Sequence, residues 1–198
     1  MDRPLGEPQA SILTAHLASV TIDPSMLFRI SSHSNGEPYF GATGGNRFDD
    51  PDRSYGVCYL GLSLDVAFGE SILHNISPTN NAFSVAHETL NNRFVHHFDG
   101  PMLRVFDLSG PSLSVIGGTL ELFSTGEYPL AQRWSAMIHR HPTLVDGFIY
   151  SSRLVPAHKA VALFNRGAGT EMEPKEPIPL RAHPDFPGVM KSFSIQEI

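Results

Sequence analysis

The residues of this sequence that could do chemistry together are two arginines, a tyrosine and a glutamate. Arg29 lies in the apolar run MLFRI, and Arg47 follows paired glycines in GGNRF. Tyr59 lies in the apolar run SYGVCYLGL, and Glu70 follows it in AFGE. Guanidinium groups bind phosphate and carboxylate oxygens through paired hydrogen bonds. A carboxylate can stabilise positive charge on a substrate. The set therefore suits a ligand that carries anionic oxygens at one place and a cation at another.

Glu70 is set among apolar residues, which distinguishes it from a surface glutamate. Its neighbours one helical turn away would be Val66, Ala67, Leu73 and His74. Burial penalises a charged carboxylate unless a cation of the protein or of a substrate lies beside it. Two interpretations follow from the sequence. Glu70 could form a structural ion pair with Arg47 or Arg29, or it could stabilise positive charge that develops on a substrate.

The paired glycines Gly44 and Gly45 also have two interpretations. The run GATGGNR matches neither the phosphate loop of nucleotide hydrolases nor the glycine pattern of dinucleotide-binding folds. The glycines could simply form a turn. They could also let the backbone approach a ligand closely, and on this second interpretation Gly45 belongs to a substrate-binding site.

For the histidines and the single cysteine, the sequence favours structural roles over metal binding or nucleophilic catalysis. The pair His96–His97 and the motif His139-x-His141 lack a third ligand at suitable spacing, so we expect no metal site. Cys58 lies in the middle of an apolar run, where a free cysteine behaves as a small apolar residue.

Composition narrows the class of protein. The chain has 198 residues, one cysteine and a formal net charge of −6. This length suits one domain, and a single cysteine fits a reducing cytoplasm. An acidic chain is a poor sequence-independent ligand for nucleic acid, so we expect no direct nucleic-acid binding. No apolar run is long enough to span a membrane, and the first twenty residues do not read as a signal peptide.

Hydrophobic periodicity predicts separate strands and helices without a regular alternation, which favours the α+β class. We expect helices within 8–19, after Ser63, within 84–91 and over 130–141 before Pro142. We expect strands at 26–30, 54–62, 102–108, 147–152 and 160–164, with 54–62 covered on both faces. Proline and glycine accumulate in 167–187, which we therefore interpret as loop or linker.

At this point the motifs resemble a known family. The runs FRI, GGNRF, VCYL, AFGE and DGFIYSSR…VALF occur in the order typical of the RES domain, from about residue 26 to 166. The resemblance implies a single compact domain over 1–198, similar to the ADP-ribosyltransferase toxin fold. Its core would span about 20–166, and 167–198 would be a proline-rich extension.

The resemblance also implies a function. Members of this family are toxins of type II toxin–antitoxin systems and are neutralised by an Xre-type helix-turn-helix antitoxin. They act on NAD, which is then a substrate and not a cofactor, by hydrolysis, by phosphorolysis or by transfer of ADP-ribose to a protein. The resemblance is compatible with a homodimer as well as with a single chain. A non-catalytic binding module and, more distantly, a metal-dependent hydrolase are the competing interpretations.

The family residues map onto positions of this chain. The catalytic set implied is Arg47, Tyr59 and Glu70, and the substrate-binding set is Arg29, Ser152 and Gly45. The arginines would hold the pyrophosphate, Glu70 the ribose and its cation, and Tyr59 the nicotinamide end. Ser152 would orient Glu70 or bind the ribose. One departure is Asn46, which interrupts the usual Gly-Gly-Arg, so the turn before Arg47 could differ from that of the family.

Overall fold

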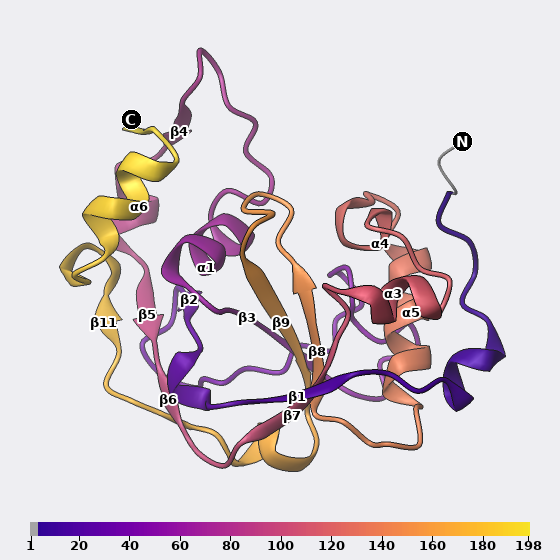
Figure 1. The fold of residues 1–198 in the computed structure, drawn as a ribbon. Coiled ribbons are helices and arrows are strands. Elements are labelled where there is room, and N and C mark those ends of the chain that lie inside the picture. The colour runs from indigo at the N-terminus through magenta and orange to yellow at the C-terminus, as the bar shows by residue number, and fades with distance from the viewer. Residues whose placement is uncertain (1–3) are drawn as a thin grey trace.

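A five-stranded sheet forms the centre of the protein in the computed structural model, which describes residues 4–198 (Figure 1). Its strands are β1 (Ser19–Ile22), β3 (Val57–Gly61), β7 (Leu103–Asp107), β8 (Gly147–Ser151) and β9 (Lys159–Phe164). They lie in the order β1-β7-β8-β9-β3, and only the neighbours β7 and β8 run parallel. This mixed sheet with separate helices confirms the α+β class.

Strand β3 is covered on both faces, as its uncharged sequence predicts. Val57 packs on one face in a cluster that includes Trp134 of helix α5 (Tyr128–His139). Cys58 and Leu60 pack on the other face in a separate cluster. Burial raises the pKa of the Cys58 thiol to about 11, which is consistent with an apolar structural role. A strand fixed from both sides gives a firm support for the residues at its edge.

Helix α1 (Leu64–Ser71) follows β3 after a tight turn. The Ser63 hydroxyl accepts a hydrogen bond from the backbone N–H of Val66 at 3.4 Å, which confirms the predicted N-cap. A Cβ atom at Gly61 would lie 2.6 Å from the backbone nitrogen of Ala67. Only glycine therefore lets the chain turn so sharply from strand to helix. This turn places the last turn of α1, which carries Glu70, beside β3.

A smaller sheet of three strands, in the order β11-β5-β2, packs beside α1. Its strands are β2 (Arg29–Ser31), β5 (Phe94–His96) and β11 (Ile178–Pro179). The two strand pairs β10 with β6 and β12 with β4 form two further sheets. These strands are β4 (Phe83–Val85), β6 (Phe98–Asp99), β10 (Glu173–Pro174) and β12 (Ile195–Glu197).

The prediction of loop or linker over 167–187 is wrong in part. The segment contains η3 (Gly167–Glu171), β10, β11 and η4 (Leu180–Ala182), and α6 (Phe186–Ser192) begins at its end. Pro174 and Pro179 lie in short strands that pair on one side only, where a missing N–H is tolerated. Leu180 and Val189 are buried in the cluster that contains Phe68 of α1. The C-terminal segment is therefore packed into the domain.

Three predicted helices also differ in extent. Residues 8–19 contain only the short η1 (Ala10–Thr14), because the chain then extends into β1 to pair with β7. The helix predicted within 84–91 is α2 (His87–Asn91), since β4 takes the preceding residues. The helix predicted over 130–141 is α5 and ends at His139.

The remaining elements are η2 (Pro24–Met26), α3 (Pro111–Val115) and α4 (Glu121–Ser124). The strands predicted at 102–108, 147–152 and 160–164 are β7, β8 and β9. Within residues 4–198, none of the helices has the length and apolar character that crossing a bilayer requires.

The packing of the C-terminal segment generates a stability prediction. Leu180→Ala removes a fully buried side chain between the tail and α1, so we expect a loss of about 2–5 kcal/mol in the free energy of unfolding. The matched control is Leu120→Ala, whose side chain is 67% exposed and which should change little. Chemical denaturation measures both. Equal denaturation midpoints for the two variants would show that the C-terminal segment does not contribute to the stability of the core.

Candidate active site

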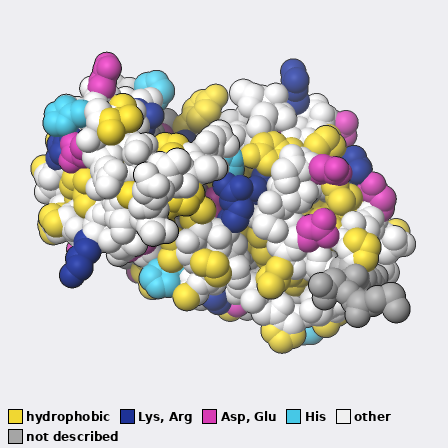
Figure 2. Space-filling view, turned by 90° about the horizontal axis from the view of Figure 1, so that it is seen from above, with side chains coloured by type: hydrophobic (Ala, Val, Ile, Leu, Met, Phe, Trp, Pro, Cys, Tyr) yellow, Lys and Arg dark blue, Asp and Glu magenta, His cyan; other side chains and the backbone are white. Residues whose placement is uncertain are grey.

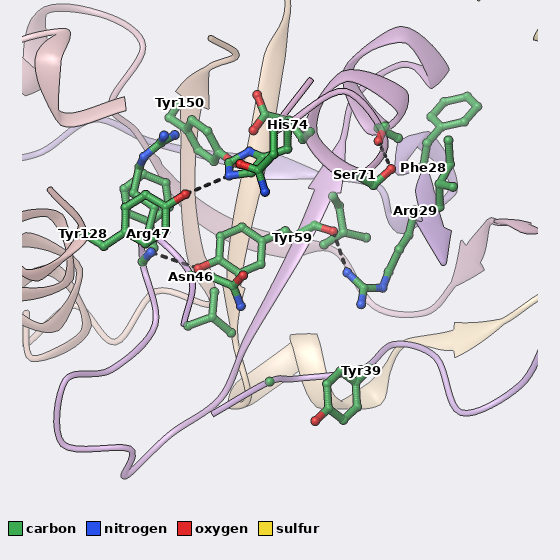
Figure 3. A pocket seen from close by; sticks show the side chains of 18 residues that line it. Phe28, Arg29, Tyr39, Asn46, Arg47, Tyr59, Ser71, His74, Tyr128 and Tyr150 are labelled. Carbon is green, nitrogen blue, oxygen red and sulfur yellow. Dashed lines mark hydrogen bonds between the residues drawn. The ribbon is translucent and has the colours of Figure 1, made fainter. Parts of the chain in front are cut away.

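A cavity of about 390 Å³ brings together four of the six residues that the sequence singled out (Figure 3). Arg29, Arg47, Tyr59 and Glu70 line it. They come from β2, the loop before β3, β3 itself and α1, so the fold collects distant parts of the chain. Seen from above, this side of the molecule is hollowed between two lobes, with basic side chains and a histidine beside the hollow (Figure 2).

Glu70 is held by a neutral donor. The Ser152 hydroxyl donates a 2.7 Å hydrogen bond to Glu70 Oε1, and Ser152 itself is only 1% exposed. Among the described residues, no lysine, arginine or histidine nitrogen lies within 4 Å of the Glu70 carboxylate. The interpretation of Glu70 as half of a structural ion pair is therefore wrong for this structure. Its carboxylate is half-buried at the cavity wall and forms no ion pair with any residue of 4–198.

Arg47 is a buried cation fixed by backbone carbonyl groups. Its Nη1 donates to the carbonyl of Phe123 at 2.6 Å, and its Nε donates to that of Thr125 at 3.3 Å. The guanidinium also lies over the ring of Tyr128, 5.5 Å from the centroid. No carboxylate oxygen of the described residues lies within 4 Å of it. Carbonyl dipoles orient this charge without neutralising it, so it can still attract an anion.

The hydroxyl of Tyr59 is used by the protein. It donates to Asp49 Oδ1 at 3.0 Å and accepts from the backbone N–H of Phe48 at 2.9 Å. Asp49 is fully buried, and its Oδ2 accepts from the backbone and side-chain nitrogens of Asn46, both at 3.1 Å. Burial raises the pKa of Tyr59, so the hydroxyl stays protonated and able to donate. Together these bonds fix the loop on which Arg47 stands.

Arg29 differs from Arg47 because it has an acidic partner. Its guanidinium forms an ion pair with Glu37, whose side chain is 3% exposed, and its Nη1 donates to the carbonyl of Tyr59 at 3.0 Å. Glu37 also accepts from the backbone N–H of Tyr39 at 2.8 Å. Sequence reasoning missed Glu37 because eight residues and a loop separate it from Arg29, with no periodic pattern to connect them.

Ser152 and Gly45 do not line the cavity. Ser152 lies directly after β8 and reaches the site only through Glu70. Gly45 is exposed, and its backbone N–H donates to the Thr43 hydroxyl at 3.2 Å. The positive φ of 74° belongs to Gly44, which is the residue that the turn itself requires to be glycine.

Several aromatic or titratable residues of the cavity were not singled out from the sequence, among them His74, Tyr128 and Tyr150. His74 lies four residues after Glu70, in the turn that follows α1, and its Nε2 is 2.8 Å from the hydroxyl of Tyr128. Burial lowers the pKa of His74, and the nearby Arg153 and Arg47 lower it further. Tyr150 is buried, and its burial raises the pKa of its hydroxyl. The spacing of His74 from Glu70 was a usable signal, whereas Tyr128 and Tyr150 looked like ordinary core positions.

The histidines considered as metal ligands have protein partners. His96 Nε2 is 2.9 Å from the carbonyl oxygen of His33, and His97 Nε2 is 3.3 Å from His183 Nε2. His139 stacks on Tyr55, and His141 Nε2 is 3.2 Å from the carbonyl of Ala15. Within the part of the chain that the structure describes, no three potential metal ligands gather.

Comparisons with known proteins agree with this architecture. The RES domain family matches residues 26–185, which is most of the chain. The protein therefore belongs to the RES domain family, as its motifs indicated. Its fold is similar to that of a chain in the crystal structure of the M. tuberculosis MbcT–MbcA toxin–antitoxin complex. The TM-score is 0.63 at 14% identity, over 93% of this chain and 95% of that one. No curated protein sequence matches this chain.

The ion pair between Arg29 and Glu37 generates a prediction. Glu37→Ala leaves the Arg29 guanidinium without its partner in a buried place, so we expect a loss of about 3–5 kcal/mol in the free energy of unfolding. The control is Glu7→Ala, which breaks an ion pair with Arg133 that is open to solvent, and should leave the unfolding midpoint unchanged. Denaturation of both variants against wild type is the measurement. If Glu37→Ala lowers the free energy of unfolding no more than Glu7→Ala does, water must solvate the Arg29 guanidinium in place of Glu37, and the prediction is wrong.

Proposed function

We propose that this protein is an enzyme that cleaves the bond between nicotinamide and ribose in NAD, and that it serves as the toxin of a toxin–antitoxin pair. One observation carries the proposal. Arg47 and Glu70 line the same cavity, and neither has a partner of opposite charge among the described residues. A buried charge without a partner is costly, and a ligand with complementary charges would compensate both.

NAD carries the required charges. Its pyrophosphate is anionic and would bind the arginines, first of all Arg47, whose guanidinium has no acidic partner. Its nicotinamide ring is cationic and leaves as a neutral molecule, so its departure needs no general acid. When the bond breaks, its electron pair goes to the ring nitrogen and positive charge develops on the ribose, as in glycoside hydrolysis. Glu70 would stabilise that charge.

The other residues would support these two. The hydrogen bond from Ser152 orients the Glu70 carboxylate while leaving its negative charge in place. The Tyr59 ring would contact the nicotinamide end, while its hydroxyl holds the loop of Arg47 through Asp49. The acceptor that attacks the ribose would be water, phosphate or a protein side chain. Water would release a proton as its new bond to the ribose forms, whereas phosphate would attack through an oxygen that already carries negative charge.

The alternative of a non-catalytic binding module finds less support. It required Glu70 and Arg47 to form a structural pair, and they do not. Transfer of ADP-ribose to a protein target uses the same bond cleavage and differs only in the acceptor. Analysis of the products by mass spectrometry separates these outcomes, because only transfer leaves ADP-ribose on a protein.

The partner we propose is an Xre-type helix-turn-helix antitoxin that covers the cleft containing Arg47. A solved structure with a similar fold comes from a toxin–antitoxin complex. With a net charge of −6, this protein is poorly suited to bind DNA, so contact with an operator would come from the antitoxin. We propose that it acts in the cytoplasm, where NAD is available. Co-production of the antitoxin should restore cellular NAD.

The role of Glu70 generates a prediction with two readouts. Glu70→Gln keeps the shape and the hydrogen bond from Ser152 but removes the negative charge. We expect NAD cleavage to fall roughly 10²–10³-fold, because an electrostatic group aimed at the transition state is lost. We expect the melting temperature to stay close to that of wild type, because no cation is left unpaired. Nicotinamide release and thermal unfolding are measured on the same sample.

The matched control is Glu88→Gln, which changes an exposed glutamate on α2 and should alter neither readout. A Glu70→Gln protein that melts early but cleaves NAD at the wild-type rate while folded would contradict the proposal. In that case Glu70 would have only an architectural role.

A further inference from the structure

When water is the acceptor, the cleavage of NAD leaves one proton that a group in the cavity must take up. The water oxygen forms a bond to the ribose carbon, and one of the protons of water must leave. A side chain that accepts this proton must line the cavity and must be unprotonated near neutral pH. The cavity wall therefore has to supply a base.

Among residues 4–198 that line the cavity, two have side chains that can accept a proton near neutral pH, Glu70 and His74. The other titratable residues of the wall are arginines, which are already protonated, and tyrosines, whose hydroxyls are very weak bases. The Glu70 carboxylate accepts the hydrogen bond from Ser152, and protonation would remove the negative charge that is to stabilise the ribose. His74 is therefore the better base.

His74 is held at the cavity through one of its two ring nitrogens. Its Nε2 lies 2.8 Å from the Tyr128 hydroxyl, and its backbone carbonyl accepts a 2.5 Å hydrogen bond from Arg153 Nη2. Its Nδ1 makes no hydrogen bond with residues 4–198 and is not enclosed by the protein. Figure 3 shows the ring directed toward Tyr128, on the side of Tyr59 where Arg47 lies. One nitrogen fixes the ring, and the other stays accessible to a small molecule.

The groups that face His74 keep its ring neutral. They are the cations Arg47 and Arg153, the carboxylate of Glu70 and the hydroxyl of Tyr128. Burial lowers the pKa of His74 from its ordinary value of 6.5, the two arginines lower it further, and Glu70 acts in the opposite direction. The ring is therefore unprotonated at neutral pH, as a base must be.

We propose that His74 is the general base that makes water a competent acceptor. This inference rests on the proposed function, since it takes the nicotinamide–ribose bond of NAD as the bond that breaks. The Nε2–H group donates to Tyr128, and Nδ1 accepts a proton from water as the water oxygen binds the ribose carbon. The electron pair of the broken bond goes to the nicotinamide nitrogen. His74 then returns its proton to solvent.

The test removes the base and then supplies an acceptor that needs none. His74→Gln keeps a donor for the Tyr128 hydroxyl but cannot accept a proton. With water as the acceptor, we expect nicotinamide release to fall roughly 10²–10⁴-fold. Azide is an anion with no proton to lose, so adding it should restore most of the nicotinamide release by His74→Gln. Mass spectrometry should then find the azide adduct of ADP-ribose as the product.

The matched control is His16→Gln, which changes an exposed histidine outside the cavity and should keep the wild-type rate with water. Thermal unfolding checks that both variants are folded. Azide also separates the proposed role from a positioning role. A variant that had only lost the orientation of Tyr128 would stay slow with azide, because azide replaces a base and not a hydrogen bond.

The pH dependence of wild type is a second measurement, which requires no variant to fold. Because His74 must be neutral to accept a proton, kcat/KM for hydrolysis should fall as the pH is lowered through its pKa, which lies below 6.5. With azide as the acceptor this decline should be absent. A decline caused by protonation of Glu70 should occur with both acceptors, so the difference between the two profiles belongs to His74.

The failures of the inference and of the proposed function are distinguishable. Three results with an active wild type would show that His74 is not the base, although the proposed function stands. They are hydrolysis by His74→Gln at the wild-type rate, no recovery of that variant with azide, and identical wild-type pH profiles with water and azide. If wild type releases no nicotinamide with either acceptor, the proposed function fails and the inference fails with it.

Discussion

The constraint on which the site depends is the separation of two opposite charges in one cavity. Arg47 and Glu70 would attract each other, and direct contact would neutralise both. Carbonyl groups of Phe123 and Thr125 hold the guanidinium, and the Ser152 hydroxyl holds the carboxylate. Neutral hydrogen-bonding partners orient a charge without cancelling it, which is how a protein preorganises a site for a charged ligand.

The rest of the fold maintains this separation. Strand β3 is fixed from both faces, and the close turn at Gly61 sets α1, and thus Glu70, against it. At the other end of the cavity, Tyr59 and the buried Asp49 tie the loop of Arg47 to the same strand. Each of the two charges is therefore positioned relative to β3, although they belong to different segments.

The sequence predicted what is local and missed what depends on distant contacts. The uncharged strand at Tyr59, the N-cap at Ser63 and the two strands β8 and β9 follow from patterns within a few residues, and all are confirmed. The C-terminal segment was misjudged because its prolines resemble a linker, while its packing on α1 depends on Leu180 and Val189 meeting residues more than a hundred positions away. Glu37 and Asp49 were missed for the same reason: their partners are set by loops that carry no periodicity.

The central claim is that the two uncompensated charges exist to bind and cleave NAD. The most direct measurement is the NAD content of cells after the protein is induced without a partner, followed alongside growth. The account predicts that NAD falls before growth stops, and that the Glu70→Gln protein at equal abundance leaves NAD unchanged. Growth arrest with a normal NAD content would contradict it, because the charges in the cavity would then serve a different substrate.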